Sequence, residues 1–122
     1  MRFPIRFDRW YEVLSRSVFL RPSRSWLDVS PDEVAVQMDW GFRARLPRAS
    51  VRGAQSLPDA RPVSRGVHGW RGRWLVNGSG QGLVSIRIEP RARGFVMGFP
   101  VRLTELLVSV DDPDKLVAAL AG

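Results

Sequence analysis

Apolar and polar residues alternate in short runs along most of this chain, and this pattern is the strongest constraint on its fold. Apolar side chains occupy every second position in 3–7 and in 42–46, and again at Val84, Ile86 and Ile88. Successive side chains of a strand point to opposite faces of a sheet, so a period of two predicts strands with one buried face. The chain is therefore expected to be mainly β.

Turn residues divide the chain into about seven strands. Pro31 and Asp32 suit a tight turn, because proline presets φ and aspartate tolerates turn geometry. Pro4 places the first strand at an edge or near its start, because proline cannot donate to a sheet ladder. The seven longer strands are expected at 3–7, 25–29, 34–39, 42–46, 70–77, 83–89 and 101–110, with short ones at 51–54 and 95–97, turns at 47–50, 78–82 and 90–94, and the longest loop at 55–69.

Two segments depart from the β pattern. In 10–20, Trp10, Val13 and Leu14 have helical spacing, whereas 18–20 looks extended, so we expect a short helix or turn followed by irregular chain. At the other end, an aspartate before Pro113 can cap a helix whose apolar stripe is Leu116, Val117 and Leu120. A helix of about two turns is not stable alone, so this one must dock on the sheet.

This order of elements predicts one domain over residues 1–122: a bent antiparallel sheet or partly open barrel, plugged at one end by the C-terminal helix. The chain has 122 residues, no cysteine and one histidine, His68. These counts exclude disulfides, thiolate metal sites and paired-histidine zinc motifs. We expect no cofactor, no metal and no catalytic activity.

The charge is strongly basic and unevenly distributed. Arginine supplies 18 of the 19 basic residues, and the formal net charge is +7. Residues 1–102 carry a net +10, whereas 103–122 carry −3. Such a basic body attracts nucleic acid or an anionic membrane surface. The arginines are dispersed, however, and a GC-rich coding genome explains the bias equally well.

The segment 67–74 is the main candidate site. If 70–77 is one strand, Trp70 and Trp74 share a face, Arg71 and Arg73 lie on the other, and Gly72 leaves a slot between the indoles. Arginine binds phosphate bidentately and tryptophan offers a stacking surface. The open alternative is that the tryptophans pack in the core and the arginines are merely solvated. A second exposed pair is Arg43 and Arg45, for which the same alternative stands.

Three other motifs favour structural roles. The glycine-rich run 78–82 precedes a strand rather than a helix, so it is a hairpin connection and not a phosphate loop. Ser79 lacks the outer glycines of a nucleophile elbow, which leaves His68 without a matching nucleophile. The aspartates around Pro113 are explained by helix capping rather than by cation binding.

A strand meander that ends in an acidic, proline-capped helix resembles the pleckstrin-homology-like (PH-like) superfold. The segments 42–51, 66–82 and 108–120 look like an uncharacterised actinobacterial family of this type. The resemblance implies a binding module with no catalytic residues. Family members that bind inositol lipids use a basic cluster in the first strand–strand loop, where this chain offers only Arg21 and Arg24.

Three functions follow as expectations. The first is a non-catalytic module that binds a protein partner or its own copies, anchored by exposed tryptophans. The second is binding of an anionic ligand, nucleic acid or anionic lipid, by Arg43, Arg45, Arg71 and Arg73. The third is an enzyme acting through His68 and the slot beside Trp70. No secretory signal or membrane-spanning run is visible in the sequence, so we expect a cytoplasmic protein.

Overall fold

The computed structural model describes residues 1–60, 62 and 65–121, except for the side chain of Trp70. Two short 3-10 turns, Pro22–Arg24 and Arg48–Ser50, precede the second and fifth strands. Along the described residues, nine strands and two helices follow in the order β1 (Arg2–Pro4), α1 (Arg9–Ser17), β2 (Ser25–Val29), β3 (Glu33–Met38), β4 (Phe42–Pro47), β5 (Val51–Ser56), β6 (Gly66–Trp70), β7 (Arg73–Asn77), β8 (Leu83–Val96), β9 (Phe99–Ser109) and α2 (Pro113–Ala121).

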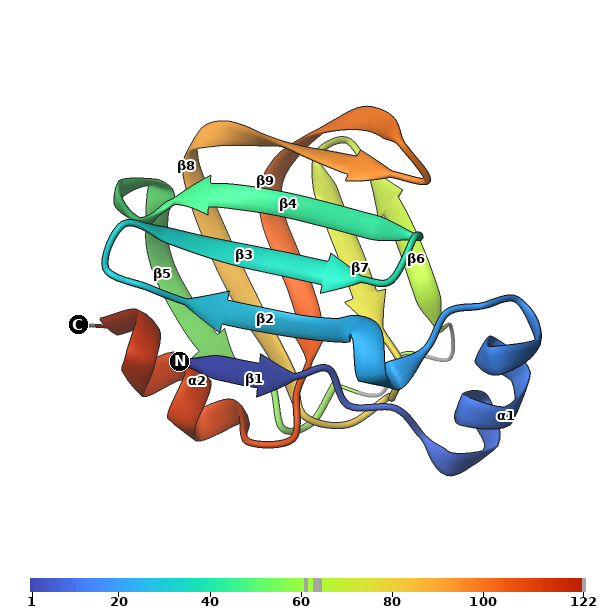
Figure 1. The fold of residues 1–122 in the computed structure, drawn as a ribbon. Coiled ribbons are helices and arrows are strands. Elements are labelled where there is room, and N and C mark those ends of the chain that lie inside the picture. Colours follow the sequence, from blue (N-terminus) through green and yellow to red (C-terminus); the bar gives the residue numbers. More distant parts are fainter. Residues whose placement is uncertain (61, 63–64, 122) are drawn as a thin grey trace.

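The strands form one curled sheet, an open half-barrel (Figure 1). Its order is β1-β2-β3-β4-β8-β9-β7-β6, and β5 pairs with β8 as well. The pairs are antiparallel except for β7 and β9, which run parallel because β9 lies between β7 and β8. The expected mainly β class and bent, partly open sheet are confirmed.

The sheet bends at β8, which has three partners. Residues 84–88 pair with β5 and residues 94–96 with β4, while β9 pairs along the opposite edge. Arg87 faces Glu105 and Ala92 faces Leu103, so five steps along β8 oppose two along β9. A bulge here accommodates Pro90, which has no N–H to give to the ladder. The turn predicted at 90–94 is therefore wrong, because the strand bulges and continues to Val96.

The alternation sorts side chains as expected. In β4, Phe42, Ala44 and Leu46 are buried, whereas Arg43 and Arg45 are exposed. The core on the inner face takes residues from every strand from β1 to β4 and from β7, β8 and β9, and the largest fully buried side chains are Phe42, Leu27, Met38, Leu46, Leu83, Ile86, Ile88, Leu103, Leu106, Leu116, Val34 and Val36.

The C-terminal helix docks on the sheet as predicted. Asp112 is the N-cap, because the backbone N–H of Lys115 donates to its Oδ1 at 3.3 Å, and Pro113 is the first helical residue. Leu116 and Leu120 are buried, and α2 packs against β5 and β8 at one end of the half-barrel (Figure 1). Arg48 ties the far end of the helix down by donating to the carbonyl of Ala119 at 3.1 Å.

The N-terminal segment closes another edge of the sheet. β1 pairs only with β2, so Pro4 lies on an edge strand as expected, and Ile5 and Phe7 bridge to Val110 and Gly78. The ambiguous segment 10–20 is mostly the helix α1, and 18–20 forms a turn rather than a strand. Only Tyr11 and Ser15 of α1 are buried, so most of this helix faces outward.

Candidate binding surfaces

The predicted single strand 70–77 is a β-hairpin instead. β6 ends at Trp70, Arg71 and Gly72 form the turn, and β7 begins at Arg73. Both turn residues have positive φ, 55° and 88°, the backbone conformation of a two-residue hairpin turn that matches the twist of its strands. The alternation of tryptophan and arginine over 70–74 predicted one continuous strand and gave no signal for this turn. The prediction that Gly72 opens a slot between two indoles on one strand is therefore wrong.

Trp74 packs toward the core rather than offering a stacking surface. It is half-buried against the hydrophobic core, and β6 pairs Gly69 with it. A Cβ at Gly69 would overlap the indole of Trp74, so this ring packs directly over the backbone of Gly69. Trp70 pairs with Arg73 through its backbone, and its side chain lies outside the described part of the structure. For Trp74, the core alternative is confirmed.

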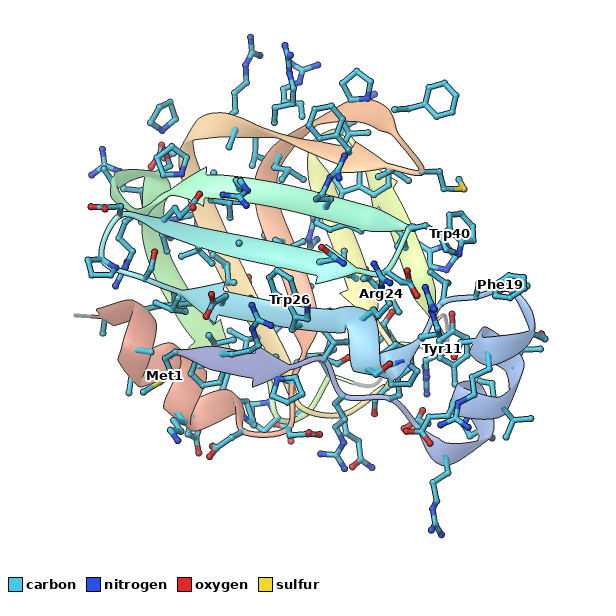
Figure 2. The ribbon with its side chains drawn as sticks, viewed as in Figure 1. Met1, Tyr11, Phe19, Arg24, Trp26 and Trp40 are labelled. Atoms are coloured by element: carbon cyan, nitrogen blue, oxygen red, sulfur yellow. The ribbon has the colours of Figure 1, made fainter. Side chains whose placement is uncertain are left out.

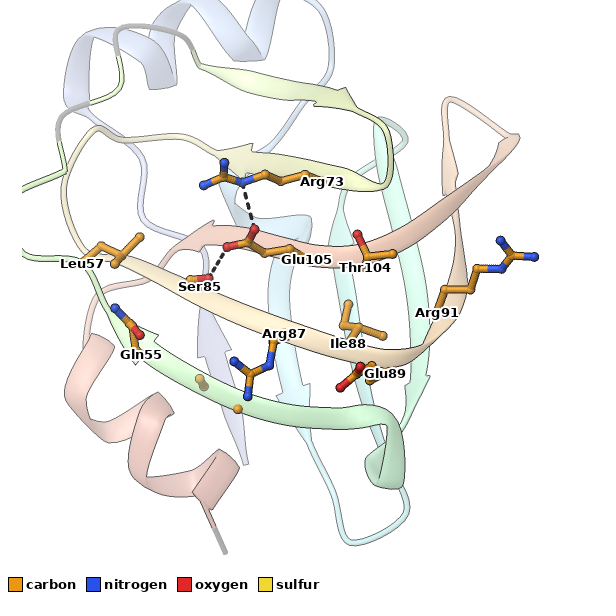
Figure 3. A pocket seen from close by; sticks show the side chains of 12 residues that line it. Gln55, Leu57, Arg73, Ser85, Arg87, Ile88, Glu89, Arg91, Thr104 and Glu105 are labelled. Atoms are coloured by element: carbon orange, nitrogen blue, oxygen red, sulfur yellow. Dashed lines mark hydrogen bonds and ion pairs between the residues drawn. The ribbon is translucent and has the colours of Figure 1, made fainter.

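Arg73 lies in a polar groove of about 720 Å³ on the outer side of the sheet. Its Nε is 2.9 Å from Oε1 of Glu105, and Ser85 donates its hydroxyl to the other carboxylate oxygen at 2.6 Å (Figure 3). The positive charge of Arg73 is thus already partnered. Arg87 and Arg91 also line the groove, without an ion pair among the described residues.

His68 and Arg73 do share a concavity. A second groove has a volume of about 710 Å³. It is lined by His68, Gly69, Arg73, Leu75, Leu83 and Leu107, and by Ala60 and Pro62. His68 is exposed, and its Nε2 lies 2.6 Å from the carbonyl oxygen of Arg65, which requires Nε2 to carry the proton and donate. Arg71 sits at the exposed hairpin tip and does not line this groove.

Ser79 takes part in a structural network, not in a pair with His68. Its hydroxyl donates to Oδ1 of Asp8 at 2.7 Å, and Arg65 holds Oδ2 at 2.8 Å. Burial raises the pKa of the Asp8 carboxyl, but the hydrogen bonds from Ser79 and Arg65 and the guanidinium charge outweigh it and lower that pKa below its ordinary value. Because Asp8 precedes α1, the network fixes that helix to the body of the domain.

Arg43 and Arg45 lie on β4, in another part of the sheet from the β6–β7 hairpin. Arg45 is paired with Glu33 at 3.0 Å, whereas Arg43 has no hydrogen bond or ion pair to the described residues. The structure therefore does not bring the two predicted arginine pairs together. Instead, Arg43 neighbours Phe95 of β8, to which its backbone is paired.

A surface that the sequence did not predict lies around α1. Nine large apolar side chains are exposed among the described residues. Apart from Met1, they lie on α1 and directly after it, in the β3–β4 turn, and at the β8–β9 turn. We call these eight the apolar edge: Trp10, Val13, Leu14, Val18, Phe19, Trp40, Met97 and Phe99. Phe19 and Trp40 lie near one another beyond the ends of β2 and β3 (Figure 2).

Hydrogen bonds join the parts of this edge. The indole N–H of Trp40 donates to the carbonyl of Val18 at 2.9 Å, and the N–H of Met97 donates to the carbonyl of Gly41 at 3.1 Å. Phe19 and Met97 have positive φ, 63° and 49°, which is unusual for bulky residues. Strained backbone of this kind is concentrated at binding and catalytic sites, and here it presents large apolar side chains to solvent.

The apolar edge escaped prediction because nothing in the sequence tells whether the apolar face of a short helix is covered. The spacing of Trp10, Val13 and Leu14 predicts a helix, but it suits a buried helix as well as an exposed one. One usable signal was the width of the apolar arc. Val13 lies about 160° around the helix from Tyr11, which is wider than the apolar stripe of about 100° typical of a helix with one buried face.

Two negative findings complete the description of these surfaces. In the described part of the chain, no helix is long and apolar enough to cross a membrane. Within residues 1–60, 62 and 65–121, no group of three or more histidine, aspartate or glutamate side chains is arranged to hold a metal ion. Comparison with known proteins adds no relative: no protein-family model, curated protein or solved structure matches this chain.

Proposed function

We propose that this domain is a non-catalytic binding module that docks on a different protein through the apolar edge. The observation that carries the proposal is that exposed apolar side chains of different segments are joined by hydrogen bonds: Trp40 to the carbonyl of Val18, and Met97 to the carbonyl of Gly41 beside Trp40. Exposed apolar side chains scattered singly need no explanation, whereas a cluster of this size is typical of an interaction site.

The aromatic side chains of the edge suit a protein interface. Trp40 is 48% exposed, yet its indole N–H is fixed by the carbonyl of Val18. Phe19 is 69% exposed, and the backbone N–H groups on both sides of its turn donate to residues of α1. Anchors that are held in place before binding lose little conformational entropy on docking, and aromatic residues dominate the energetics of such interfaces.

The charges around the edge favour an acidic partner. Arg9 and Arg16 are exposed on α1, and Arg21 and Arg24 lie on the segment that follows it. The nearby carboxylate of Asp39 is 6% exposed and pairs with Arg21 at 2.8 Å and with Arg24 at 3.7 Å, so one negative charge is shared by two arginines and a net positive charge remains. Carboxylates on the partner would face these arginines, whereas a symmetric dimer through this edge would bring the arginines of both copies together.

We also propose that the chain is a PH-like domain of the actinobacterial family that its sequence resembles. The curled half-barrel and the helix that packs on its end support this assignment. The cytoplasmic location expected from the sequence stays a prediction.

The test uses wild type and three variants as baits: a double variant on α1, a single variant at Trp40, and a control. Val13→Gln with Leu14→Gln removes apolar surface from α1 without touching a buried side chain, and Trp40→Gln removes the fixed indole. Trp26→Gln is the control for loss of an indole, because Trp26 lies on the outer side of β2 and its ring contacts Arg2, at 4.1 Å, rather than the apolar edge. We expect one protein to bind wild type and the control in a purified binary assay, and to bind the edge variants at least tenfold more weakly.

Unfolding by urea shows whether the variants remain intact, since exposed substitutions change stability by only about 0.5 kcal/mol. Equal loss of binding in the control and the edge variants would remove the proposal. Light scattering that reveals a dimer disrupted only by the edge variants would replace the foreign partner with a second copy of the chain. Binding of the edge to anionic phospholipid vesicles, with no protein captured, would replace the protein with a membrane.

A further inference from the structure

A second surface, on the outer face of β4, β8 and β9, gathers arginines that are distant in the sequence. Gln37, Arg43, Phe95 and Pro100 form one row across neighbouring strands through the pairs 37–43, 43–95 and 95–100. In the next row Arg93 is paired with Arg102, and continuing the β4–β8 register by one residue brings Arg45 level with Arg93. Arg43, Arg45, Arg93 and Arg102 are all exposed around the half-buried Phe95, and we call this surface the arginine face.

The pair of Arg93 and Arg102 is electrostatically unfavourable as it stands. Directly opposed side chains of an antiparallel pair have Cβ atoms about 4.5–5.5 Å apart, and like charges at this distance destabilise the sheet. Neither guanidinium has a hydrogen bond or ion pair to the described residues. Together with Arg91 they line a hollow of about 470 Å³ whose described lining contains no carboxylate. An anion bound between them would remove this repulsion.

The spacing suits several phosphates rather than a single one. Neighbouring strands are about 4.8 Å apart, and alternate residues of one strand are about 7 Å apart. The arginine face is therefore a lattice of guanidinium groups, each able to grip a phosphate bidentately. One of its members, Arg45, already has a carboxylate partner in Glu33, so Arg43, Arg93 and Arg102 carry most of the available charge.

Phe95 distinguishes between polyanions. Its side chain lies in the same row as Arg43 and is half-buried, so part of the ring remains available to a ligand. Bases stack on such rings in proteins that bind single strands without sequence preference, whereas in a duplex the bases are already stacked on one another. A membrane interface instead takes up protruding apolar side chains, which this chain carries on the apolar edge.

We propose that the arginine face binds single-stranded nucleic acid, with phosphates on Arg43, Arg93 and Arg102 and a base stacked on Phe95. This site adjoins the apolar edge at the β8–β9 turn, but it uses other side chains and does not depend on the function proposed for that edge. It replaces the arginine set expected from the sequence, because Arg73 is ion-paired with Glu105 and lies on another part of the sheet.

The test is fluorescence anisotropy of a labelled single-stranded oligonucleotide of about 12 nucleotides, titrated with the full chain over a range of salt concentrations. Arg93→Gln with Arg102→Gln should weaken binding at least tenfold at low salt. It should also reduce the slope of log K against log salt by about 1.4, because each lost phosphate contact on a single strand is worth about 0.7. Phe95→Leu keeps an apolar side chain but removes the π-face, so it should weaken binding with little change in the slope.

The matched control is Arg9→Gln with Arg16→Gln, which removes the same charge from exposed positions on α1. We expect this control to keep the wild-type slope to within experimental error. Equal effects of the two double variants would overturn the proposal, since binding would then follow net charge alone. No binding at low salt, or binding of anionic phospholipid vesicles that the oligonucleotide does not displace, would overturn it too. Failure of this test would leave the docking role of the apolar edge untouched.

Discussion

Gly69 leaves space that the indole of Trp74 fills, and this contact decides which way the β6–β7 hairpin presents its side chains. The ring packs over the bare backbone of the neighbouring strand and reaches the core. With Trp74 turned inward, Arg73 before it on β7 and His68 on β6 line the outer groove. Glycine at position 69 therefore leaves the space in which the Trp74 indole packs against the core.

Gly69→Ala tests this packing. The new methyl group would overlap the Trp74 ring, so the indole must move, and such overpacking costs about 1–3 kcal/mol in the free energy of unfolding. Urea unfolding and near-ultraviolet circular dichroism measure the loss of stability and the movement of the ring. The matched control is Gly53→Ala, where a Cβ would meet only the movable end of the Arg87 side chain at 3.4 Å. If both variants are as stable as wild type, the Trp74 indole does not pack over Gly69.

Asp8 gives the protein a predictable response to acid. Its pKa is lower in the folded chain than in the unfolded chain, so its contribution to the free energy of unfolding is complete well above pH 4. The contribution is lost as the pH falls through the folded-state pKa. We expect Asp8→Asn to lose about 1.5–3 kcal/mol at neutral pH, and to lose less than wild type on further acidification.

Urea unfolding at about pH 7 and about pH 3 measures both quantities. Asp59→Asn is the control, because Asp59 is exposed and has no ion pair to the described residues. An Asp8→Asn variant that loses stability on acidification as steeply as wild type would show that the Asp8–Arg65–Ser79 network does not carry this pH dependence.

At the scale of elements, α2 was the most predictable part of the chain and α1 the least. The cap, the proline and the apolar stripe of α2 all lie within ten residues, so local chemistry defines that helix. The strands of β4 and β9 were equally clear from their alternation. The β6–β7 turn differs from the prediction because the alternation of tryptophan and arginine runs through it without a break. The bulge at Pro90 could not be predicted because it depends on the pairing of β8 with more distant strands.

The candidate site was predicted less well than the fold for the same reason. His68 and Arg73 do line one groove, but the charge of Arg73 is taken by Glu105, which lies 32 positions further along the chain. Arg93 and Arg102 become neighbours only because β8 continues through its bulge. The exposure of α1 depends on what the rest of the sheet leaves uncovered, and no local pattern encodes that.

Capping of α2 is tested by Asp112→Ala, with Asp111→Ala as its neighbour and control. Only Asp112 accepts the N–H of Lys115, so its loss should cost about 1 kcal/mol, whereas the exposed Asp111 should cost little. Leu116→Ala, which removes a fully buried side chain, should cost about 2–5 kcal/mol. Thermal unfolding of the three variants gives the ranking. If Asp111→Ala were less stable than Asp112→Ala, Asp112 would not be the residue that caps α2.

At the scale of the whole molecule, the two proposed binding surfaces meet at the β8–β9 turn, where Met97 and Phe99 of the apolar edge adjoin Phe95 and Pro100 of the arginine face. The buried inner face is closed at one end by α2, and the apolar edge lies around α1, which projects from another part of the sheet (Figure 1). The arginine face occupies the outer side of β4, β8 and β9.

Photo-cross-linking in living cells tests the docking role most directly. A benzophenone analogue of phenylalanine would replace Phe19 on the apolar edge or, as the control, Trp26 on the outer side of β2. We expect position 19 to give one dominant adduct with a different protein, and position 26 to give no such adduct. The same adducts at both positions, or adducts at position 19 only with lipid or with a second copy of this chain, would contradict docking of a protein partner on the apolar edge.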